Sequence, residues 1–127
     1  MKTRAFFITI LATGLILLAG SAYAELSTNL QIRKETDPKN RKISTWTYIG
    51  RDGNPAFADD KGYAAVRYTY KEGKLAELTE YLDLDGKLIN NIDGYAMKTC
   101  TYSGKKLTET IYMDSRGYQV TGPEGYA

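Results

Sequence analysis

Residues 62–96 read GYAAVRYTYKEGKLAELTEYLDLDGKLINNIDGYA, and this stretch begins and ends with the same tripeptide, Gly-Tyr-Ala. A third copy ends the sequence, so the copies are Gly62-Tyr63-Ala64, Gly94-Tyr95-Ala96 and Gly125-Tyr126-Ala127, spaced by 32 and then 31 residues. Self-similarity at a fixed period of this length is typical of repeat proteins, in which each unit packs on its neighbours. The sequence therefore predicts a short array of one repeated unit.

Tyrosines and turn residues keep the same order in each unit. A tyrosine lies five residues before a turn glycine three times, as Tyr48 and Gly53, Tyr81 and Gly86, and Tyr112 and Gly117. On this alignment residues 1–24 precede the array and residues 25–127 form one domain. We divide the domain into a degenerate N-terminal hairpin (25–47), a first unit (48–80), a second unit (81–111) and a partial third unit (112–127).

Each unit is predicted to contain a β-hairpin. Residues 64–70 and 96–102 are rich in aromatic and β-branched side chains, and a link containing glycine separates each from a second such run, 75–82 and 107–113. The glycine shifts by one position between the links 71–74 and 103–106, and we expect the links to have equal length. Residues 30–36 and 43–49 predict a further hairpin around Asp37-Pro38-Lys39-Asn40.

The expected fold class follows from these runs. No segment after residue 24 has a sustained apolar period of 3.6 residues, so we expect little or no helix. We predict an all-β protein, in which antiparallel β-hairpin repeats of about 32 residues form an elongated twisted sheet or an open solenoid.

The first 24 residues have the features of a secretory signal peptide. Lys2 and Arg4 give a basic start, residues 6–18 are nearly all apolar, and Ala22-Tyr23-Ala24 offers a cleavage site. The apolar run is short for a membrane span. We expect cleavage after residue 24 and export to a bacterial periplasm, the cell surface or the exterior, with an uncleaved N-terminal anchor as the alternative.

Composition argues against several kinds of partner and site. The chain has 17 Lys+Arg and 15 Asp+Glu, and removal of Lys2 and Arg4 with the signal leaves 15 of each. A balanced, mixed surface disfavours nucleic acid and anionic membrane as partners. The chain has no His, which is the commonest general base and metal ligand. We predict a protein without enzyme activity, metal or cofactor.

Two segments carry a resemblance to a known family, Tyr81-Leu82-Asp83-Leu84-Asp85-Gly86-Lys87 and Tyr112-Met113-Asp114-Ser115-Arg116-Gly117. Over roughly residues 46–127 the pattern resembles the tyrosine–aspartate (YD/RHS-like) hairpin repeats of exported and cell-surface bacterial proteins. Trp46-Thr47-Tyr48 is more distantly similar to cell-wall-binding hairpin repeats, including the choline-binding type, although this chain has one Trp and a longer unit. The resemblance implies a β-hairpin array outside the cytoplasm and implies no particular activity.

Tyrosine supplies the candidate binding residues. Ten of the 11 tyrosines follow residue 24, and stacked hairpins would place some of them in rows. Aromatic faces can stack on sugars and on extended chains, so a row of them could bind a glycan or a peptide. The alternative is that the tyrosines fill a thin core. The residues proposed for the aromatic face are Trp46, Tyr48, Tyr68, Tyr70, Tyr81, Tyr102 and Tyr112.

The segment Asp83-Leu84-Asp85-Gly86 could suggest a calcium loop. The helix–loop–helix type is excluded because Lys87 and Gly94 stand where further ligands are needed. A calcium ion held between units by Asp83, Asp85 and Asp114 is the remaining form of this hypothesis. We favour plain turns, which Asp-Gly pairs commonly form.

Three glutamates could act as catalytic carboxylates, namely Glu77, Glu80 and Glu109. Glu77 and Glu109 are taken as equivalent positions of successive units. No nucleophile–base pair or metal cluster accompanies them in the sequence, so a solvated strand face is the preferred interpretation.

Cys100 and the end of the sequence suggest two routes to self-association. Cys100 occupies the position that Tyr68 has in the preceding unit, which favours packing, with an intermolecular disulfide as the alternative. The partial third unit predicts an open sheet edge that could pair with another chain. We expect residues after about Thr121 to be poorly ordered in the monomer.

These observations predict an exported, non-enzymatic repeat protein that acts as a binding or structural module for a protein or a cell-surface glycan. One alternative is a self-assembling protein that pairs through its open C-terminal repeat. Another is a small hydrolase or inhibitor without a recognisable motif.

Overall fold

The structure is a computed structural model that describes residues 25–123, so residues 1–24, for which a signal peptide is predicted, and the third Gly-Tyr-Ala lie outside the described residues. The described residues form one seven-stranded β-sheet, preceded by a single turn of 3-10 helix. The elements are η1 (Ser27–Asn29), β2 (Gln31–Thr36), β3 (Ile43–Ile49), β4 (Ala65–Glu72), β5 (Leu75–Leu82), β6 (Met97–Ser103), β7 (Lys106–Met113) and β8 (Gln119–Val120).

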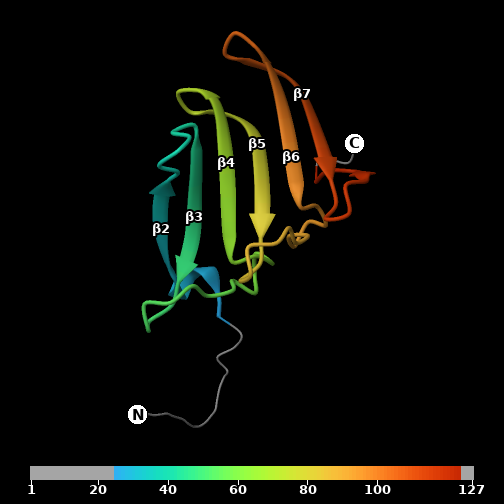
Figure 1. Ribbon diagram of the computed structural model, residues 1–127. Coiled ribbons are helices and arrows are strands. Elements are labelled where there is room, and N and C mark those ends of the chain that lie inside the picture. Colours follow the sequence, from blue (N-terminus) through green and yellow to red (C-terminus); the bar gives the residue numbers. More distant parts are fainter. Residues whose placement is uncertain (1–24, 124–127) are drawn as a thin grey trace.

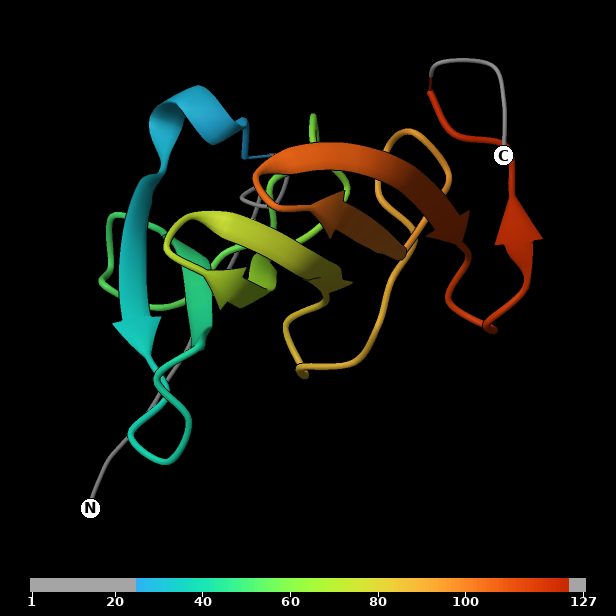
Figure 2. The same ribbon diagram turned by 90° about the horizontal axis from the view of Figure 1, so that it is seen from above.

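Each strand pairs in the antiparallel direction with the next strand along the chain, so the order in the sheet is the order in the sequence. Figure 1 shows the strands side by side, and Figure 2 shows that the sheet twists and remains open. Within residues 25–123 no second sheet or helical layer packs on it. The predicted all-β fold of antiparallel hairpins is therefore confirmed, in the form of an open twisted sheet.

The helical content of the described residues is limited to η1. Residues 25–123 accordingly contain no helix with the length and apolar character needed to cross a membrane.

The glycine of Gly-Tyr-Ala sets a backbone conformation. Gly62 and Gly94 have φ angles of 83° and 91°, in the left-handed region that side chains rarely adopt. At Gly62 the space is also closed, because a Cβ atom would lie 2.8 Å from the backbone nitrogen of Ile92. The loop of the first unit thus packs directly on the loop of the second.

The alanine of the tripeptide joins neighbouring hairpins. The Ala64 carbonyl accepts a hydrogen bond from the Tyr48 N–H, and the Ala64 N–H donates to the Leu82 carbonyl, both at 2.9 Å. Ala96 makes the same two bonds one unit later, both at 2.8 Å. Both alanines are fully buried, at 1% and 0% exposure. A larger side chain would overpack these positions.

The tyrosine of the tripeptide completes a row of rings that we call the tyrosine ladder, formed by Tyr48, Tyr63, Tyr81, Tyr95 and Tyr112. Successive ring centroids lie 5.7, 4.8, 5.6 and 4.6 Å apart. The two loop tyrosines alternate with the three strand tyrosines, in tilted and edge-to-face contacts that aromatic pairs prefer. The ladder links all units, as expected for repeats that bury each other's tyrosines.

The hairpin turns correct the expected alignment of the two units. Both turns consist of two residues, Gly73-Lys74 and Gly104-Lys105, so the predicted equal length is confirmed, although each turn is shorter than four residues and its glycine does not shift. The register shows unpaired bulge residues at Glu77 and Thr108, and the first hairpin has a further bulge at Lys71. The one-residue difference between the units is therefore absorbed within β4, where a bulge can accommodate it without changing the turn.

Candidate functional site

The structure places all seven predicted aromatic residues on one face of the sheet. Trp46, Val66 and Tyr81 pair in one row across β3, β4 and β5. Tyr68, Thr79, Lys98 and Tyr112 pair in the next row. Paired residues of an antiparallel sheet share a face, as do residues two or four positions apart along a regular strand. That rule adds the remaining members, which are Tyr48, Tyr70 and Tyr102.

The loops divide this face into a core region and an open region. Tyr48, Tyr81 and Tyr112 belong to the tyrosine ladder, where the loop tyrosines pack on them and leave Tyr112 only 4% exposed. The other four predicted residues lie nearer the hairpin turns and are half-buried. We call this second group the aromatic strip; it consists of Trp46, Tyr68, Tyr70 and Tyr102.

The aromatic strip runs diagonally across three hairpins. The Trp46 and Tyr68 rings meet edge to face with centroids 5.1 Å apart, and Tyr68 stacks on Tyr70 at 5.9 Å. The Tyr102 hydroxyl donates a 2.9 Å hydrogen bond to the carbonyl of Ala76, which is the strand partner of Tyr70. Tyr102 therefore reaches across β5 toward the rest of the strip.

Polar contacts fix the Trp46 ring. Its Nε1–H donates a 3.0 Å hydrogen bond to Ser44 Oγ, and Lys34 Nζ lies 4.1 Å from the ring centroid. Lys34 comes from the edge strand β2, directly opposite Trp46 in the register. A cation at this distance is attracted by the ring face.

A hollow of about 190 Å³ lies where the strip meets the ladder. This volume is smaller than the roughly 300–1,000 Å³ of pockets that hold a drug-sized ligand, so the hollow is too small to enclose such a ligand. The residues that line it are Ile32, Trp46, Tyr48, Tyr63, Val66 and Tyr68.

Four tyrosines of the ladder and the strip have raised pKa values and are neutral hydrogen-bonding groups at ordinary pH. Burial raises the pKa of Tyr68 and, together with neighbouring Cys100, that of Tyr102. Burial first, and then the neighbouring tyrosines, raise the pKa of Tyr63 and Tyr81 as well. The face therefore offers apolar rings edged by protonated hydroxyls.

Two of the three aspartates considered as calcium ligands, Asp83 and Asp114, cap turns. The carboxylate of Asp83 accepts hydrogen bonds from the amides two and four residues later, at 2.8 and 2.9 Å. Asp114 does the same at 2.9 and 3.0 Å and also binds the Arg116 guanidinium at 2.9 Å. This is the local capping that makes aspartate favourable in turns. Residues 25–123 contain no cluster of three acidic or sulfur side chains suited to a metal.

The glutamates weighed as catalytic groups do not form a pair. Glu80 binds Arg67 at 2.9 Å, whereas Glu77 is an exposed bulge residue. Glu109 pairs with Thr101 in the regular part of β7, so Glu77 and Glu109 are not equivalent positions, contrary to the expected alignment. Cys100 is half-buried on the aromatic face and makes no disulfide among the described residues.

Sequence reasoning missed four residues of this face. The sequence identifies Tyr63 and Tyr95 only as repeat markers. In the structure they pack on the three strand tyrosines of the ladder and cover them, whereas the tyrosines of the strip have no such cover within residues 25–123. Ile32 and Lys34 belong to β2, where the alternation of the strand could have pointed to the face they share with Trp46.

Comparison of the chain with protein-family models, with curated proteins and with solved structures finds no match. The resemblance to tyrosine–aspartate hairpin repeats therefore stays a prediction that rests on the residues quoted above.

Proposed function

We propose that this chain is an exported, non-enzymatic binding module that holds a glycan chain against the aromatic strip. The observation that carries the proposal is the strip itself: four half-buried aromatic side chains lie together on a face that no other described layer covers. A contiguous apolar patch on an uncovered face can mark an interaction site, and aromatic rings with a polar edge suit such a site.

The shape of the strip favours a glycan over a protein partner. The cross-strand row that contains Tyr68 also holds the polar residues Ser44, Thr79 and Lys98, so the strip is narrow. A stable protein interface needs a continuous patch of about 800 Å² per partner with an apolar centre. A narrow line of rings with hydroxyl edges instead matches a sugar chain, which offers apolar ring faces and hydroxyls in alternation.

Tryptophan fluorescence provides a direct test, because Trp46 is the chain's only Trp and belongs to the strip. We expect purified peptidoglycan fragments or soluble polysaccharides to change its emission in a saturable way. Tyr70→Ala should weaken binding by about tenfold, as loss of a stacking aromatic costs on the order of 1 kcal/mol. Tyr118→Ala is the matched control, because Tyr118 is exposed in a turn away from the strip. Equal binding by all three proteins would rule out the strip as the site.

Self-assembly is the second candidate, and the open sheet supports it. All six residues of β2 are exposed, and this edge strand has no partner on its outer side among residues 25–123. Its charged residues Arg33, Lys34 and Glu35 disfavour pairing with a second chain, a common protection of sheet edges. Light scattering over a concentration series tests this candidate, which predicts a mass that grows with concentration.

A further inference from the structure

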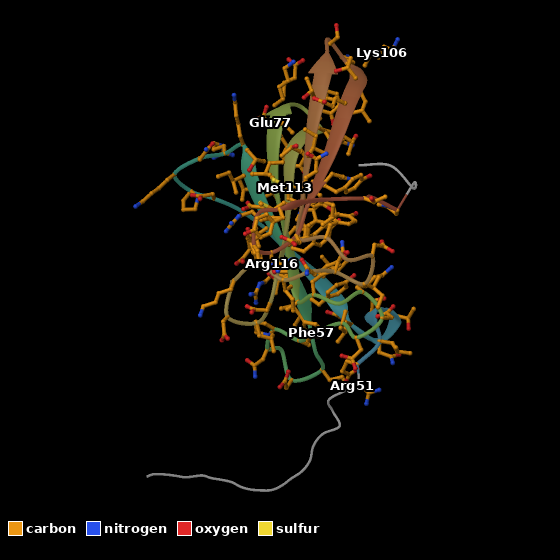
Figure 3. All side chains as sticks on the ribbon, turned by 90° about the vertical axis from the view of Figure 1, so that its right-hand side faces the viewer. Arg51, Phe57, Glu77, Lys106, Met113 and Arg116 are labelled. Atoms are coloured by element: carbon orange, nitrogen blue, oxygen red, sulfur yellow. The ribbon has the colours of Figure 1, made fainter. Side chains whose placement is uncertain are left out.

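The two ends of the sheet carry opposite charge, although the balanced composition conceals it. In an antiparallel sheet whose order follows the chain, every second connection lies at the same end. The turns 37–42, 71–74 and 103–106 therefore form one end, and the loops 50–64, 83–96 and 114–118 form the other. Figure 1 shows this separation, and Figure 3 places Lys106 and Arg51 at opposite extremes.

The turn end is basic and the loop end is acidic. The three turns contain seven basic and two acidic residues, whereas the three loops contain seven acidic and four basic residues. All seven basic residues of the turns are exposed, and none forms an ion pair within the described part of the chain. They are Lys39, Arg41, Lys42, Lys71, Lys74, Lys105 and Lys106.

The basic turns adjoin the aromatic strip. Tyr70 pairs with Ala76 and Tyr102 pairs with Leu107, each within three residues of a turn glycine. Lys74 and Lys105 belong to different hairpins, yet they line one open hollow between the second and third turns. Cations and aromatic rings thus lie next to each other at this end of the sheet.

We infer that the turn end binds an acidic polysaccharide, whose carboxylates contact the lysines while its sugar rings contact the strip. This inference rests on the proposed glycan-binding function and narrows its ligand class. Strands lie about 4.8 Å apart, so turns two strands apart are separated by about 10 Å. A chain with regularly repeated charges can span that distance and engage several turns at once, which a single small anion cannot do.

The test measures binding of polygalacturonate and of neutral dextran by Trp46 fluorescence and calorimetry at 50 and 200 mM NaCl. The main variant is Lys74→Glu/Lys105→Glu, and Arg51→Glu/Lys87→Glu at the loop end makes the same change in net charge. We expect the main variant to weaken polygalacturonate binding by about tenfold or more, because exposed charges contribute modestly and additively. The control should bind as the parent does, and added salt should weaken binding to the parent.

Each other outcome overturns a specific part of the argument. If dextran and polygalacturonate bind equally, and the Lys74→Glu/Lys105→Glu variant binds as the parent does, an acidic ligand is ruled out. The aromatic strip would then remain the proposed glycan site. Binding that needs Lys74 and Lys105 but not Tyr70 would refute the proposed function and retain an anion site. If duplex DNA or phosphatidylserine vesicles bind more tightly than polygalacturonate, the ligand of the turn end is a nucleic acid or a membrane and not a polysaccharide. If the protein forms a salt-sensitive dimer that the main variant does not form, the turn end binds a second copy of the chain. If neither polysaccharide binds, the inference is refuted.

Discussion

Gly62 and Gly94 stand at the same position of successive units, but their surroundings differ. Both have a positive φ, so any side chain is strained there. Only Gly62 also touches a neighbouring loop, whereas a Cβ atom at Gly94 would meet nothing within 4 Å. The positive φ explains the glycine at both positions, and the close contact with the neighbouring loop is a second reason at Gly62 alone.

This difference leads to a paired prediction. Gly94→Ala should destabilise the fold by about 1–2 kcal/mol, the usual cost of placing a residue with a Cβ in the left-handed region. Gly62→Ala should cost clearly more, because the new Cβ would lie 2.8 Å from the Ile92 nitrogen and 3.1 Å from the Asn91 carbonyl carbon. Chemical denaturation of both variants gives the comparison. Equal losses would show that the two loops do not pack as described.

Asp114 gives the fold a dependence on acid. Hydrogen bonds from the Arg116 guanidinium, and then from backbone amides, hold the pKa of this carboxyl below its ordinary value. A lowered native pKa means that ionised Asp114 stabilises the folded state. That contribution is present above the ordinary aspartate pKa of about 3.9 and is lost as the pH falls through the lowered value.

Asp114→Asn should therefore lower the melting temperature at pH 6, and the gap from the parent should narrow at pH 3. Asp85→Asn serves as the control, because it removes one charge from a turn carboxylate that accepts no described hydrogen bond. A gap of constant size across this pH range would show that the carboxylate charge does not stabilise the turn.

At the scale of elements, the seam between β5 and β6 is the shortest pairing between two of the long strands, β2 to β7. Only three residue pairs join these strands, whereas seven pairs join β4 to β5 and seven join β6 to β7. The hydrogen bond from Tyr102 to the Ala76 carbonyl crosses this seam near the turns. A strip residue thus also connects two hairpins.

Tyr102→Phe should cost about 0.5–1.5 kcal/mol, the net worth of one intramolecular hydrogen bond, and should speed amide exchange in β5 and β6 near the turns. Tyr70→Phe is the matched control, since the Tyr70 hydroxyl makes no hydrogen bond among the described residues. Hydrogen exchange read by mass spectrometry would compare the two. If exchange in Tyr102→Phe became faster in β2 and β3 instead, the Tyr102 hydrogen bond would not be what stabilises the pairing of β5 with β6.

The elements were predictable from local composition, but their irregularities were not. Runs of aromatic and β-branched residues predicted all the long strands, and the run 75–82 matches β5 at both ends. The bulges at Lys71, Glu77 and Thr108 escaped prediction because one extra residue changes neither the composition of a strand nor its turn signal. That error also produced the mistaken equivalence of Glu77 and Glu109.

At the scale of the whole molecule, the sequence predicted which residues share a face but not how that face divides. Tyrosines at similar spacing form both the core region and the open region of this face. Tyr63 and Tyr95 make the difference, because they pack from the loops onto the ladder tyrosines of the strands and leave the strip uncovered. The opposite charges of the two ends likewise depend on which turns meet at one end. The composition of the chain does not show which turns lie at the same end of the sheet, whereas the order of the strands does.

The tyrosine ladder should make the array unfold as one unit. Tyr95 is 6% exposed and lies between Tyr81 of β5 and Tyr112 of β7, so it joins the β4–β5 hairpin to the β6–β7 hairpin. Tyr95→Ala should cost about 3–5 kcal/mol, as is usual for removing a buried aromatic ring. It should also separate the unfolding of β6, β7 and β8 from that of β2 to β5, because the ring contacts of Tyr95 would no longer reinforce the backbone pairing between β5 and β6.

Tyr70→Ala provides the contrast, since it removes an equal ring from the open strip, and should leave a single transition with a smaller loss. Calorimetry reports the number of transitions, and emission from Trp46 on β3 reports the N-terminal part separately. If the two probes of Tyr95→Ala still coincide, the backbone bonds of Ala64 and Ala96 hold the units together. The ladder would then fill the core without coupling the repeats.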